Sequence, residues 1–428
     1  MNIWIINPYA VPPTLGGLNR HYFFKKYLEE YGHSVTVFSS SSIYNRQYNL
    51  FEKKEKGLYK VKMFDGLDFV YVKTPDGRNI ISRLLAIHTF CERLKKISKK
   101  NFFEKPDVVY VSVSPEIEIG ILGNYLAREF DCPSIIELRD LYPDTLVSLK
   151  RIKESNLLYK IMSHSFKKTL CRADGLVFTM DGGKKYISDK KWDISNGGKI
   201  DLNSVYIINN GVDLASFDIL KNNNYTDRDL DNPEFKNIVY TGSMGIANDL
   251  DRLLAIAKEC HFEKVRFILW GDGKTKKHLI ERINNEKINN VIIKDPVDGK
   301  CIPNIIEKSF ATVMIQKDIK CDAKYGISSN KSFQYMAAGR PIILLANAPF
   351  DLFDRYKPGL QLKENDPHKN ATDINNFIFN MHDDILYHQC CCNAREMAKN
   401  YDYKSISHKF EKAIEEILTN FKTKKGKS

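Results

Sequence analysis

The chain has 428 residues, of which 43% are hydrophobic and 28% are charged, and its formal net charge is +12. This length exceeds what one hydrophobic core usually organises, and this composition excludes a chain that is disordered over most of its length. The positive charge favours an anionic partner, which could be nucleic acid, a phospholipid surface or a phosphorylated substrate.

The first half of the chain alternates between short apolar runs and helical patterns, which is typical of βαβ units. The runs predict strands at 2–6, 34–38, 107–111, 134–138, 175–178 and 205–208, with helices at 18–31, 116–130 and 153–171.

A second series begins after the polar segment 221–234. It predicts strands at 237–240, 265–270, 291–293, 311–315 and 341–345. Strands this apolar, alternating with helices, indicate parallel sheets that are covered on both faces. We therefore predict an α/β fold with two doubly wound, Rossmann-like domains at 1–200 and 201–400. A helix at 402–420 would complete the first domain, and 421–428 would form a basic, disordered tail.

The nine cysteines include no CxxC pair, and three of them are adjacent at 390–392, just after His388. Adjacent thiols seldom converge on one ion, so we predict no metal site and a reducing cytosol. The apolar run at the N-terminus is too short for a signal peptide, and no stretch reaches the ~18 apolar residues of a membrane span. We expect a cytoplasmic protein that can touch a membrane.

Ligands of open α/β sheets bind outside the carboxyl ends of the strands, so the loops there are candidate sites. Two of these loops carry glycines before a helix, with Gly16 and Gly17 in the first domain and Gly242 beside Ser243 in the second. Glycine lets the backbone approach an anion, and a helix N-terminus favours negative charge, although a tight turn explains the same residues. Neither loop is the dinucleotide fingerprint, which disfavours a dehydrogenase.

A third loop, 326–330, leads into a short helix at about 330–338 that ends at Gly339. Lys331 lies in its first turn, where the helix dipole disfavours a cation unless an anion is bound there. Gln334 lies one turn later and could reach a sugar hydroxyl. A second interpretation is a packing helix, with Phe333 in the core, and opposite faces allow both.

A fourth loop follows the strand at 134–138 and holds Glu137, Arg139 and Asp140. Three charged residues at a strand end suggest contacts with a substrate. A structural ion pair between Arg139 and an acid explains them equally well.

These segments, taken in this order, resemble the retaining glycosyltransferases of family four, also called group 1. The resemblance extends to four further segments, 32–33, 106–109, 210–213 and 271–273. The nearest resemblance is to O-antigen and capsule transferases of the N-acetylfucosamine transferase type. It implies the GT-B fold, a nucleotide-sugar donor on the C-terminal domain and an acceptor on the N-terminal one. It also implies front-face attack without a metal or other cofactor.

The resemblance assigns roles to individual residues. Lys331 and the amides near Asn330 would hold the donor diphosphate, and Gly16 with Gly17 would close over it. Asp140 or Arg139 would face the sugar or the acceptor hydroxyl. The remaining candidates for the donor and sugar sites are Gly242, Ser243, Gly271, Asp272, Gly326, Ser328, Gln334, Asn210 and Glu137.

The chain departs from the wider family at two points. The family has two glutamates eight positions apart, where this chain has Gly326 and Gln334. The usual Arg/Lys pair after the strand at 237–240 is replaced by Ser243 and by Asn248 with Asp249. Both departures concern the ribose and diphosphate contacts rather than the fold.

The segment 82–105 has seven Lys or Arg and two Glu, with apolar residues interleaved at helical spacing. This pattern predicts an interfacial helix on anionic lipid, near a polyprenyl-diphosphate-linked glycan acceptor, or else an ordinary helix with a solvated face. We therefore predict a glycosyltransferase that is peripheral at the inner face of the cytoplasmic membrane. It would move a sugar from a UDP-, GDP- or dTDP-sugar to a lipid-linked O-antigen or capsule glycan.

Three other functions fit part of the sequence. A sugar-nucleotide epimerase could use Asp140 and Glu137 for proton transfer. A catalytically degenerate scaffold is suggested by Gly326 and Gln334. A nucleic-acid binder would explain the net charge, but no helix-turn-helix, RNP or zinc pattern supports it. The sequence does not specify the sugar, the base, the acceptor or the oligomeric state.

Overall fold

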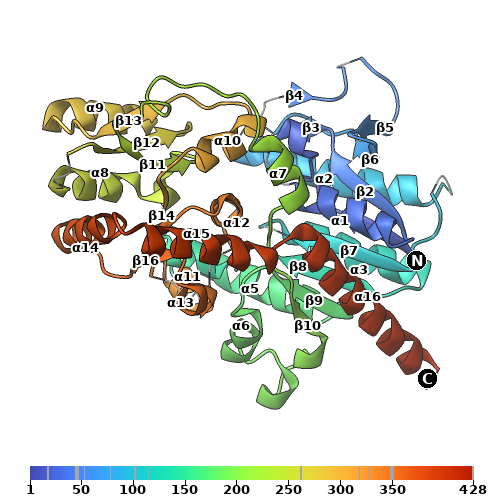
Figure 1. Cartoon of the computed structure of the whole chain (residues 1–428). Helices are drawn as coiled ribbons and strands as arrows, with labels where there is room; N and C mark the ends of the chain where they lie inside the picture. The colour runs from blue at the N-terminus through green and yellow to red at the C-terminus, as the bar shows by residue number, and fades with distance from the viewer. Residues whose placement is uncertain are drawn as a thin grey trace. The chain divides into compact units, whose positions relative to one another are not determined.

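The computed structural model of the chain describes residues 1–16, 19–43, 48–52, 54–77, 79–100, 103–113, 115–260, 263–317, 319–326, 328–347 and 351–426, with side chains except at 351 and 352. It divides into two compact units (Figure 1). Unit 1 comprises Met1–Asn209 and Tyr403–Ser428, and unit 2 comprises Asn210–Asp402. Across the described ranges, no helix combines the length and the apolar character that crossing a bilayer requires.

The described part of unit 1 is built on an eight-stranded sheet in the order β10-β9-β8-β7-β1-β2-β6-β5. Its strands are β1 (Asn2–Ile6), β2 (Ser34–Ser40), β5 (Tyr59–Phe64), β6 (Leu67–Val72), β7 (Val108–Val113), β8 (Ser134–Leu138), β9 (Gly175–Phe178) and β10 (Val205–Ile207). Neighbouring strands are parallel except at the β5–β6 edge. A separate two-stranded antiparallel sheet pairs β3 (Ser42–Ile43) with β4 (Tyr48–Asn49).

The antiparallel edge is a difference from the all-parallel sheet that we predicted. The hairpin turns at Asp65 and Gly66, which have φ angles of 50° and 83°. Two consecutive positive φ angles match the right-handed twist of paired strands, and Asp-Gly is a favoured pair for them. The turn signal was therefore present in the sequence, but the two strands it joins were not predicted.

The helices of unit 1 form two layers. α2 (Ile80–Ser98), α3 (Ile117–Phe130) and α5 (Leu157–Leu170) connect strands in the β2-to-β9 direction, while α1 (Arg20–Glu30) connects β1 to β2 in the reverse direction. Because such crossovers are right-handed, α1 lies on the opposite face of the sheet from the other three. The short helices are η1 (Pro13–Leu15), α4 (Asp144–Ser148), α6 (Gly183–Asp189), η3 (Ile194–Asn196) and η4 (Leu202–Ser204).

The last helix, α16 (Tyr403–Lys425), returns to unit 1 and packs against α1. Phe410 is buried there, with its ring centroid 4.6 Å from that of Phe24 and 4.7 Å from that of Tyr110. The helix continues to Lys425, so the prediction of a disordered tail from 421 was wrong for the residues up to 425. Lys422, Lys424 and Lys425 lie in its last turn, where the helix dipole stabilises cations.

Unit 2 has a six-stranded parallel sheet in its described part, in the order β13-β12-β11-β14-β15-β16. The strands are β11 (Lys236–Thr241), β12 (Val265–Trp270), β13 (Val291–Lys294), β14 (Ala311–Ile315), β15 (Ile342–Leu345) and β16 (Gly359–Leu362). The helices are α7 (Leu214–Leu220), η5 (Ile246–Asn248), α8 (Leu250–Glu259), α9 (Lys276–Glu286), η6 (Gly299–Cys301), α10 (Ile302–Glu307), α11 (Lys320–Tyr325), α12 (Asn330–Ala338), α13 (Asp351–Tyr356), α14 (Pro367–Asn380) and α15 (Asp384–Lys399).

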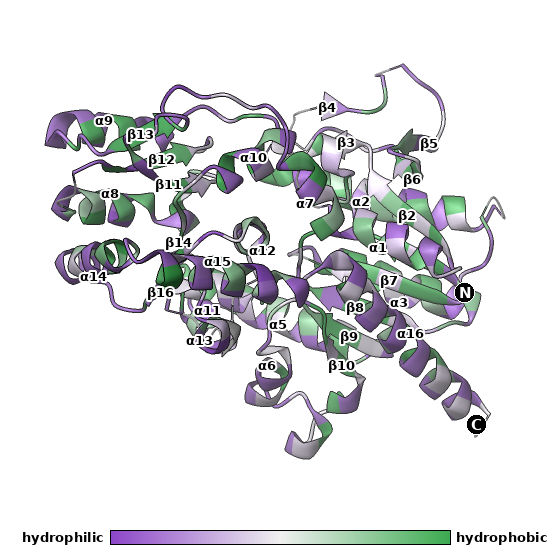
Figure 2. Cartoon of the chain, viewed as in Figure 1, coloured by the Kyte–Doolittle hydropathy of each residue, from purple (hydrophilic) through white to green (hydrophobic). Residues whose placement is uncertain are grey.

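Both faces of this second sheet are covered, as its apolar strands predicted. Ile238 and Tyr240 of β11 belong to one buried cluster, whereas Val239 between them belongs to another on the opposite face. The strands are coloured mainly as hydrophobic, while the helices carry both colours (Figure 2). The predicted α/β class with two parallel-sheet layers is confirmed, and the loops at the carboxyl ends of β11, β12 and β14 become the candidate site of unit 2.

Candidate functional site

The loops that follow β11 and β12 interlock through their backbones. The Gly242 amide donates to the Trp270 carbonyl at 3.0 Å, and the Met244 amide donates to the Asp272 carbonyl at 2.7 Å. Gly271 has a φ angle of 157°, and a Cβ there would lie 1.8 Å from the Gly242 carbonyl oxygen. Glycine is therefore required at this crossing, and two backbone hydrogen bonds tie the Gly242 loop to the Gly271 loop.

Lys331 reaches this loop from the first turn of α12. Its ammonium group donates to the Tyr240 hydroxyl at 3.0 Å and to the Asn248 side-chain oxygen. It also lies over the Tyr240 ring, 4.7 Å from the ring centroid. A Cβ built on Gly242 would be 3.6 Å from Lys331 Nζ, which places the cation directly above the glycine loop.

The partners of this cation are all neutral. Burial lowers the pKa of Lys331 to about 8 and raises the pKa of Tyr240 far above its usual value, so the phenol stays protonated. Within the described ranges, no carboxylate forms an ion pair with Lys331. A shielded cation without a counter-charge, beside a glycine loop and a helix N-terminus, is an arrangement that suits an anionic ligand.

The Tyr240 and Asn248 side chains also hold the loop itself. The Tyr240 hydroxyl donates to the Ser243 carbonyl at 2.7 Å, and the Asn248 amide donates to the same oxygen at 2.8 Å. One pair of side chains thus positions both the Gly242–Ser243 backbone and the Lys331 ammonium group. Neither Tyr240 nor Asn248 was among the predicted site residues, because their partners lie 83 or more positions away in the sequence.

The other predicted donor residues lie around the start of α12 or on the neighbouring loop. The Asn210 amide donates to Ser328 Oγ at 3.2 Å, and its side chain donates to the Ser328 carbonyl at 3.0 Å. The predicted helix at 330–338 is confirmed, but Ser329 makes no side-chain capping bond to it, and Asn330 is exposed. Gly326 ends α11 with a φ angle of 92°.

For the four remaining candidates, the structure gives few or no contacts. Gln334 is half-buried on α12, and Asp272 is exposed with its carboxylate accepting the Gly273 amide at 2.8 Å. In unit 1, Gly16 ends the 3-10 helix η1 with a φ angle of 67°. Gly17 lies outside the described residues.

Glu137 of β8 is fully buried, which corrects its assignment to a sugar contact. Its carboxylate pairs with Arg20 Nε at 2.6 Å and with His21 Nε2 at 3.3 Å. Although burial alone raises a carboxyl pKa, these two partners hold the pKa of Glu137 well below its usual range. The charge is thus satisfied inside unit 1, where Arg20 also donates to the carbonyls of Ile208 and Asn209.

His21 is neutral within this network, because burial lowers its pKa. The carboxylate of Glu137 can only accept a hydrogen bond, so Nε2 of the ring carries the proton. The Asn7 amide then donates to Nδ1 at 3.2 Å. The epimerase interpretation loses one of its two acids, since a carboxylate held in this way is unsuited to exchanging protons with a substrate.

The two other predicted residues of this loop lie nearer the surface, where Arg139 is half-buried and Asp140 is exposed. Arg139 is close enough to Glu116 and Tyr9 to influence both of their pKa values. Tyr9 donates to Glu116 at 2.7 Å, and Arg83 Nε of α2 lies 3.6 Å from the same carboxylate. Burial raises the pKa of Glu116 despite these partners.

Three of these residues, Tyr9, Arg83 and Glu116, were not predicted as site residues. Together with Arg139 we call them the Glu116 cluster. Tyr9, Glu116 and Arg139 follow the carboxyl ends of β1, β7 and β8, and Arg83 lies at the start of α2. The sequence did contain one signal for this cluster, because Glu116 lies just beyond a predicted strand, where ligands of α/β sheets bind.

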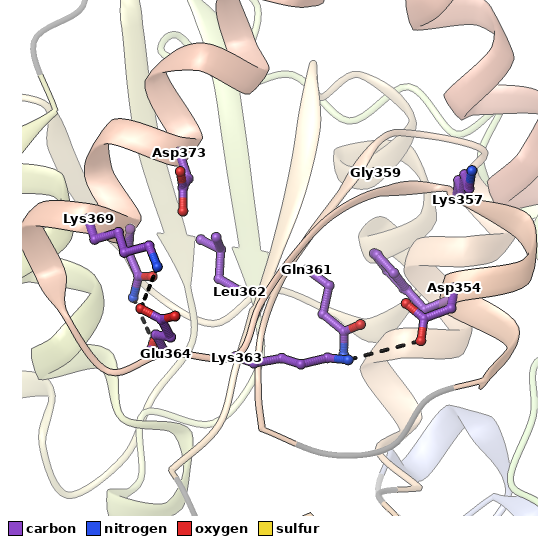
Figure 3. Close-up of a pocket in the computed structure, with 11 residues that line it drawn as sticks. Asp354, Lys357, Gly359, Gln361, Leu362, Lys363, Glu364, Lys369 and Asp373 are labelled. Atoms are coloured by element: carbon purple, nitrogen blue, oxygen red, sulfur yellow. Dashed lines mark hydrogen bonds and ion pairs between the residues drawn. The ribbon is translucent and has the colours of Figure 1, made fainter.

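Unit 2 also contains a pocket of about 470 Å³ near the carboxyl end of β16 (Figure 3). Its lining has three lysines and three acidic residues, and two ion pairs form among them, Lys369 with Glu364 at 2.7 Å and Lys363 with Asp354 at 4.0 Å. It therefore offers no excess charge to a phosphorylated ligand. Among the described residues, no group of His, Cys, Asp and Glu could hold a metal ion, and the 390–392 cysteines lie along α15.

Comparisons with known proteins concern the fold and the C-terminal unit. Residues 235–380 match the family model of the glycosyl transferases group 1. The sequence matches no curated protein.

Among solved structures, sucrose-phosphate synthase from Thermosynechococcus elongatus has a TM-score of 0.69 at 14% identity, covering 98% of this chain and 99% of that one. Trehalose 6-phosphate synthase from Burkholderia multivorans has a TM-score of 0.70 at 11% identity, with 99% and 98% covered. HepE from Anabaena in complex with UDP and glucose has a TM-score of 0.64 at 12% identity, with 97% and 100% covered.

The structural matches span both units and give the fold, while the family model covers the strands and helices that carry the Lys331 site. Members of this family transfer a sugar from a nucleotide-sugar donor with retention of configuration, as the resemblance implied. The chain thus has the GT-B fold, and residues 235–380 of its C-terminal unit resemble the glycosyl transferases group 1 family.

Proposed function

We propose that this enzyme transfers a sugar from a nucleotide-diphospho-sugar to a lipid-linked surface glycan of the O-antigen or capsule type, with Lys331 holding the donor diphosphate. The observation that carries the donor site is the ammonium group of Lys331 above the Gly242 loop, with only neutral partners. A diphosphate would supply the negative charge that this cation lacks.

In the transfer step, the bond between the anomeric carbon and the diphosphate oxygen breaks. The acceptor hydroxyl forms the new bond on the same face of the sugar, and its proton passes to the departing diphosphate. Negative charge therefore grows on the diphosphate oxygens. Lys331 and the backbone amides at the start of α12 would stabilise that charge without rearranging.

The position of Lys331 explains how this chain can lack the Arg/Lys pair of the wider family. Asn248 stands where a basic residue is usual, and its side-chain oxygen accepts a hydrogen bond from Lys331. The cation thus comes from α12 rather than from the loop after β11, yet it lies beside that loop. This substitution argues for an active enzyme rather than for a degenerate scaffold.

On the acceptor side, we assign Arg139 and Asp140 of unit 1 to the sugar or the acceptor hydroxyl. Arg139 Nε is buried and has no hydrogen-bond partner among the described residues, so its N–H can donate to an oxygen of the ligand. Since the HepE structures contain UDP and UDP-glucose, UDP-sugars are the first donors to test.

The test is a thermal-shift screen of UDP-, GDP- and dTDP-sugars on wild type, Lys331→Ala and the control Lys277→Ala, whose lysine is exposed on α9. A ligand at 100 times its Kd stabilises a protein by about 2.7 kcal/mol. We expect one donor class to stabilise wild type and the control, with Lys331→Ala losing about 100-fold in affinity. Equal stabilisation of wild type and Lys331→Ala would contradict the assignment.

Product analysis then separates transfer from epimerisation. The donor found in the screen is incubated with the enzyme, with and without a lipid-linked glycan acceptor. We expect a glycosylated lipid product only when the acceptor is present. Conversion of the sugar nucleotide in its absence would favour the epimerase.

A further inference from the structure

Two helices of unit 1 expose large apolar side chains at their N-terminal ends. They are Ile80, Ile81, Leu84 and Leu85 of α2, and Leu157, Leu158 and Ile161 of α5. Each of these seven side chains is between 53% and 79% exposed. The apolar residues later in α2, such as Phe90 and Leu94, are buried in the unit, so the predicted interfacial helix at 82–105 is not exposed along its length.

Both helix ends project beyond α3, which lies between α2 and α5. On one side, His88 of α2 pairs with Glu118 of α3 at 2.8 Å. The second residue of α3 is thus level with the ninth residue of α2, and at 1.5 Å per residue the start of α2 projects by about 10 Å.

α5 projects in the same way on the other side of α3. Asn124 of α3 donates to the Thr169 carbonyl near the end of α5, at 2.9 Å. The start of α5 therefore extends about 8 Å beyond the start of α3. Because all three helices follow parallel strands of one sheet, their N-termini point to the same edge, and the two apolar ends project in one direction.

In the two chain segments that carry these ends, basic residues outnumber acidic ones. The segment 150–160, which leads into α5, has four Lys or Arg and one Glu, and the segment 79–88 has one Arg, one His and no acid. Lys150, Arg151, Lys153 and Lys160 are exposed. Exposed apolar side chains interspersed with basic residues match the boundary between acyl chains and anionic headgroups.

We propose that the projecting ends of α2 and α5 insert into an anionic lipid bilayer and seat unit 1 on the membrane. This deepens the proposed function, since it rests on a lipid-linked acceptor and names the surface that meets the lipid. Arg83 lies in the α2 end and also pairs with Glu116, so the inserted surface adjoins the Glu116 cluster. An acceptor headgroup would emerge from the bilayer next to that cluster.

Flotation with vesicles tests the proposal, comparing phosphatidylcholine alone with an equal mixture of phosphatidylcholine and phosphatidylglycerol. The variant combines Ile80→Ser, Ile81→Ser, Leu157→Ser and Leu158→Ser. The matched control combines Ile219→Ser and Ile385→Ser in unit 2, whose side chains are equally exposed. We expect wild type and control to float with the anionic vesicles, and the variant to bind at least about tenfold more weakly.

Insertion is detected separately by tryptophan fluorescence. The three native tryptophans are all buried, so an Ile81→Trp or Leu158→Trp variant adds the exposed indole of interest. We expect brominated anionic lipid to quench these two variants and to leave an Ile219→Trp variant unchanged. Equal binding by wild type and the serine variant, equal binding to neutral vesicles, or self-association of wild type in place of vesicle binding would each overturn the proposal.

The donor screen keeps this result distinct from the proposed function. The serine variant should retain donor-induced stabilisation, since none of its changes lies in the Lys331 site, and this also shows that it folds. Lys331→Ala should still float with anionic vesicles. If wild type binds no donor, the result weighs against the proposed function alone. If wild type does not float with anionic vesicles, the result weighs against the membrane surface alone.

Discussion

Glu137 in unit 1 is a fully buried charged group, and Lys331 in unit 2 is a half-buried one. Glu137 has two basic partners, and the ion pair with Arg20 is complete within the unit. Lys331 has a phenol and an amide, which orient it but do not neutralise it. The difference distinguishes a charge that stabilises the fold from one that is held ready for a ligand.

In the sequence, both residues are charged groups beside a strand or helix end, and both were candidates for a ligand contact. The pairing partners are what separate them, and these are visible only in the structure. The comparison is testable, because removing a satisfied charge should damage the fold, whereas removing an unsatisfied one should damage binding.

The largest expected effect is on stability, from Glu137→Gln. Glutamine keeps the shape of the side chain but leaves the buried Arg20 guanidinium without a counter-charge, which costs about 3–5 kcal/mol. Thermal and urea unfolding of the full chain should show the loss. The control is Glu118→Gln, an exposed pair with His88, which should change stability by less than about 1 kcal/mol.

The difference in stability between wild type and Glu137→Gln should change with pH in one direction. Because Arg20 and His21 depress the pKa of Glu137, its stabilisation is present above the ordinary carboxyl pKa of about 4 and is lost as the pH falls further. The gap between wild type and Glu137→Gln should therefore narrow in acid. A gap that widens would contradict the assignment of Glu137 as a charged partner of Arg20.

Gly271→Ala tests whether the rigidity of the Gly242 loop matters to donor binding. The added Cβ would lie 1.8 Å from the Gly242 carbonyl oxygen, so the backbone must move, at a cost of about 3 kcal/mol. We expect a lower melting temperature and weaker donor-induced stabilisation. Gly299→Ala, where a Cβ would meet no atom within 4 Å, should behave as wild type.

Most of the fold could be predicted because its strands are apolar on both faces. The runs at 134–138, 175–178, 265–270 and 311–315 are identical in extent to β8, β9, β12 and β14. The β5–β6 hairpin was missed because β5 is an edge strand with alternating exposed positions, so its residues are less apolar.

Less of the site could be predicted, because pairing across the chain leaves no local pattern. Lys331 was identifiable from the unfavourable position of a cation in the first turn of a helix. Its partner Tyr240 is 91 positions away, and the Glu137–Arg20 pair joins residues 117 apart, so neither was accessible from spacing. A buried ion pair and a substrate contact therefore looked alike in the sequence.

The pH dependence of donor binding is the next effect in size. With the pKa of Lys331 at about 8, the free enzyme loses its cation as the pH rises above that value, whereas a bound diphosphate favours the protonated form. The apparent Kd of the donor should rise with pH above about 8, by at most about tenfold per unit. A titration from neutral to alkaline pH checks this, and Lys331→Arg, if it binds donor, should show no such rise.

The smallest effect is a gain in stability from Lys331→Met. The folded pKa of about 8 lies below the ordinary lysine value of about 10.4, so the charged side chain is more stable in the unfolded chain at neutral pH. Removing the charge should raise the melting temperature of unit 2 by about 2–4 °C, which corresponds to about 1 kcal/mol. The loss of two hydrogen bonds, to Tyr240 and Asn248, opposes this gain and keeps it small.

Lys331→Met should also lose donor-induced stabilisation. Its gain in stability over wild type should vanish as the pH approaches the pKa of lysine in the unfolded chain, because the native Lys331 side chain is then also neutral. A variant that is less stable than wild type at neutral pH would mean that Lys331 is a structural cation like Arg20, and the contrast between the two units would fail.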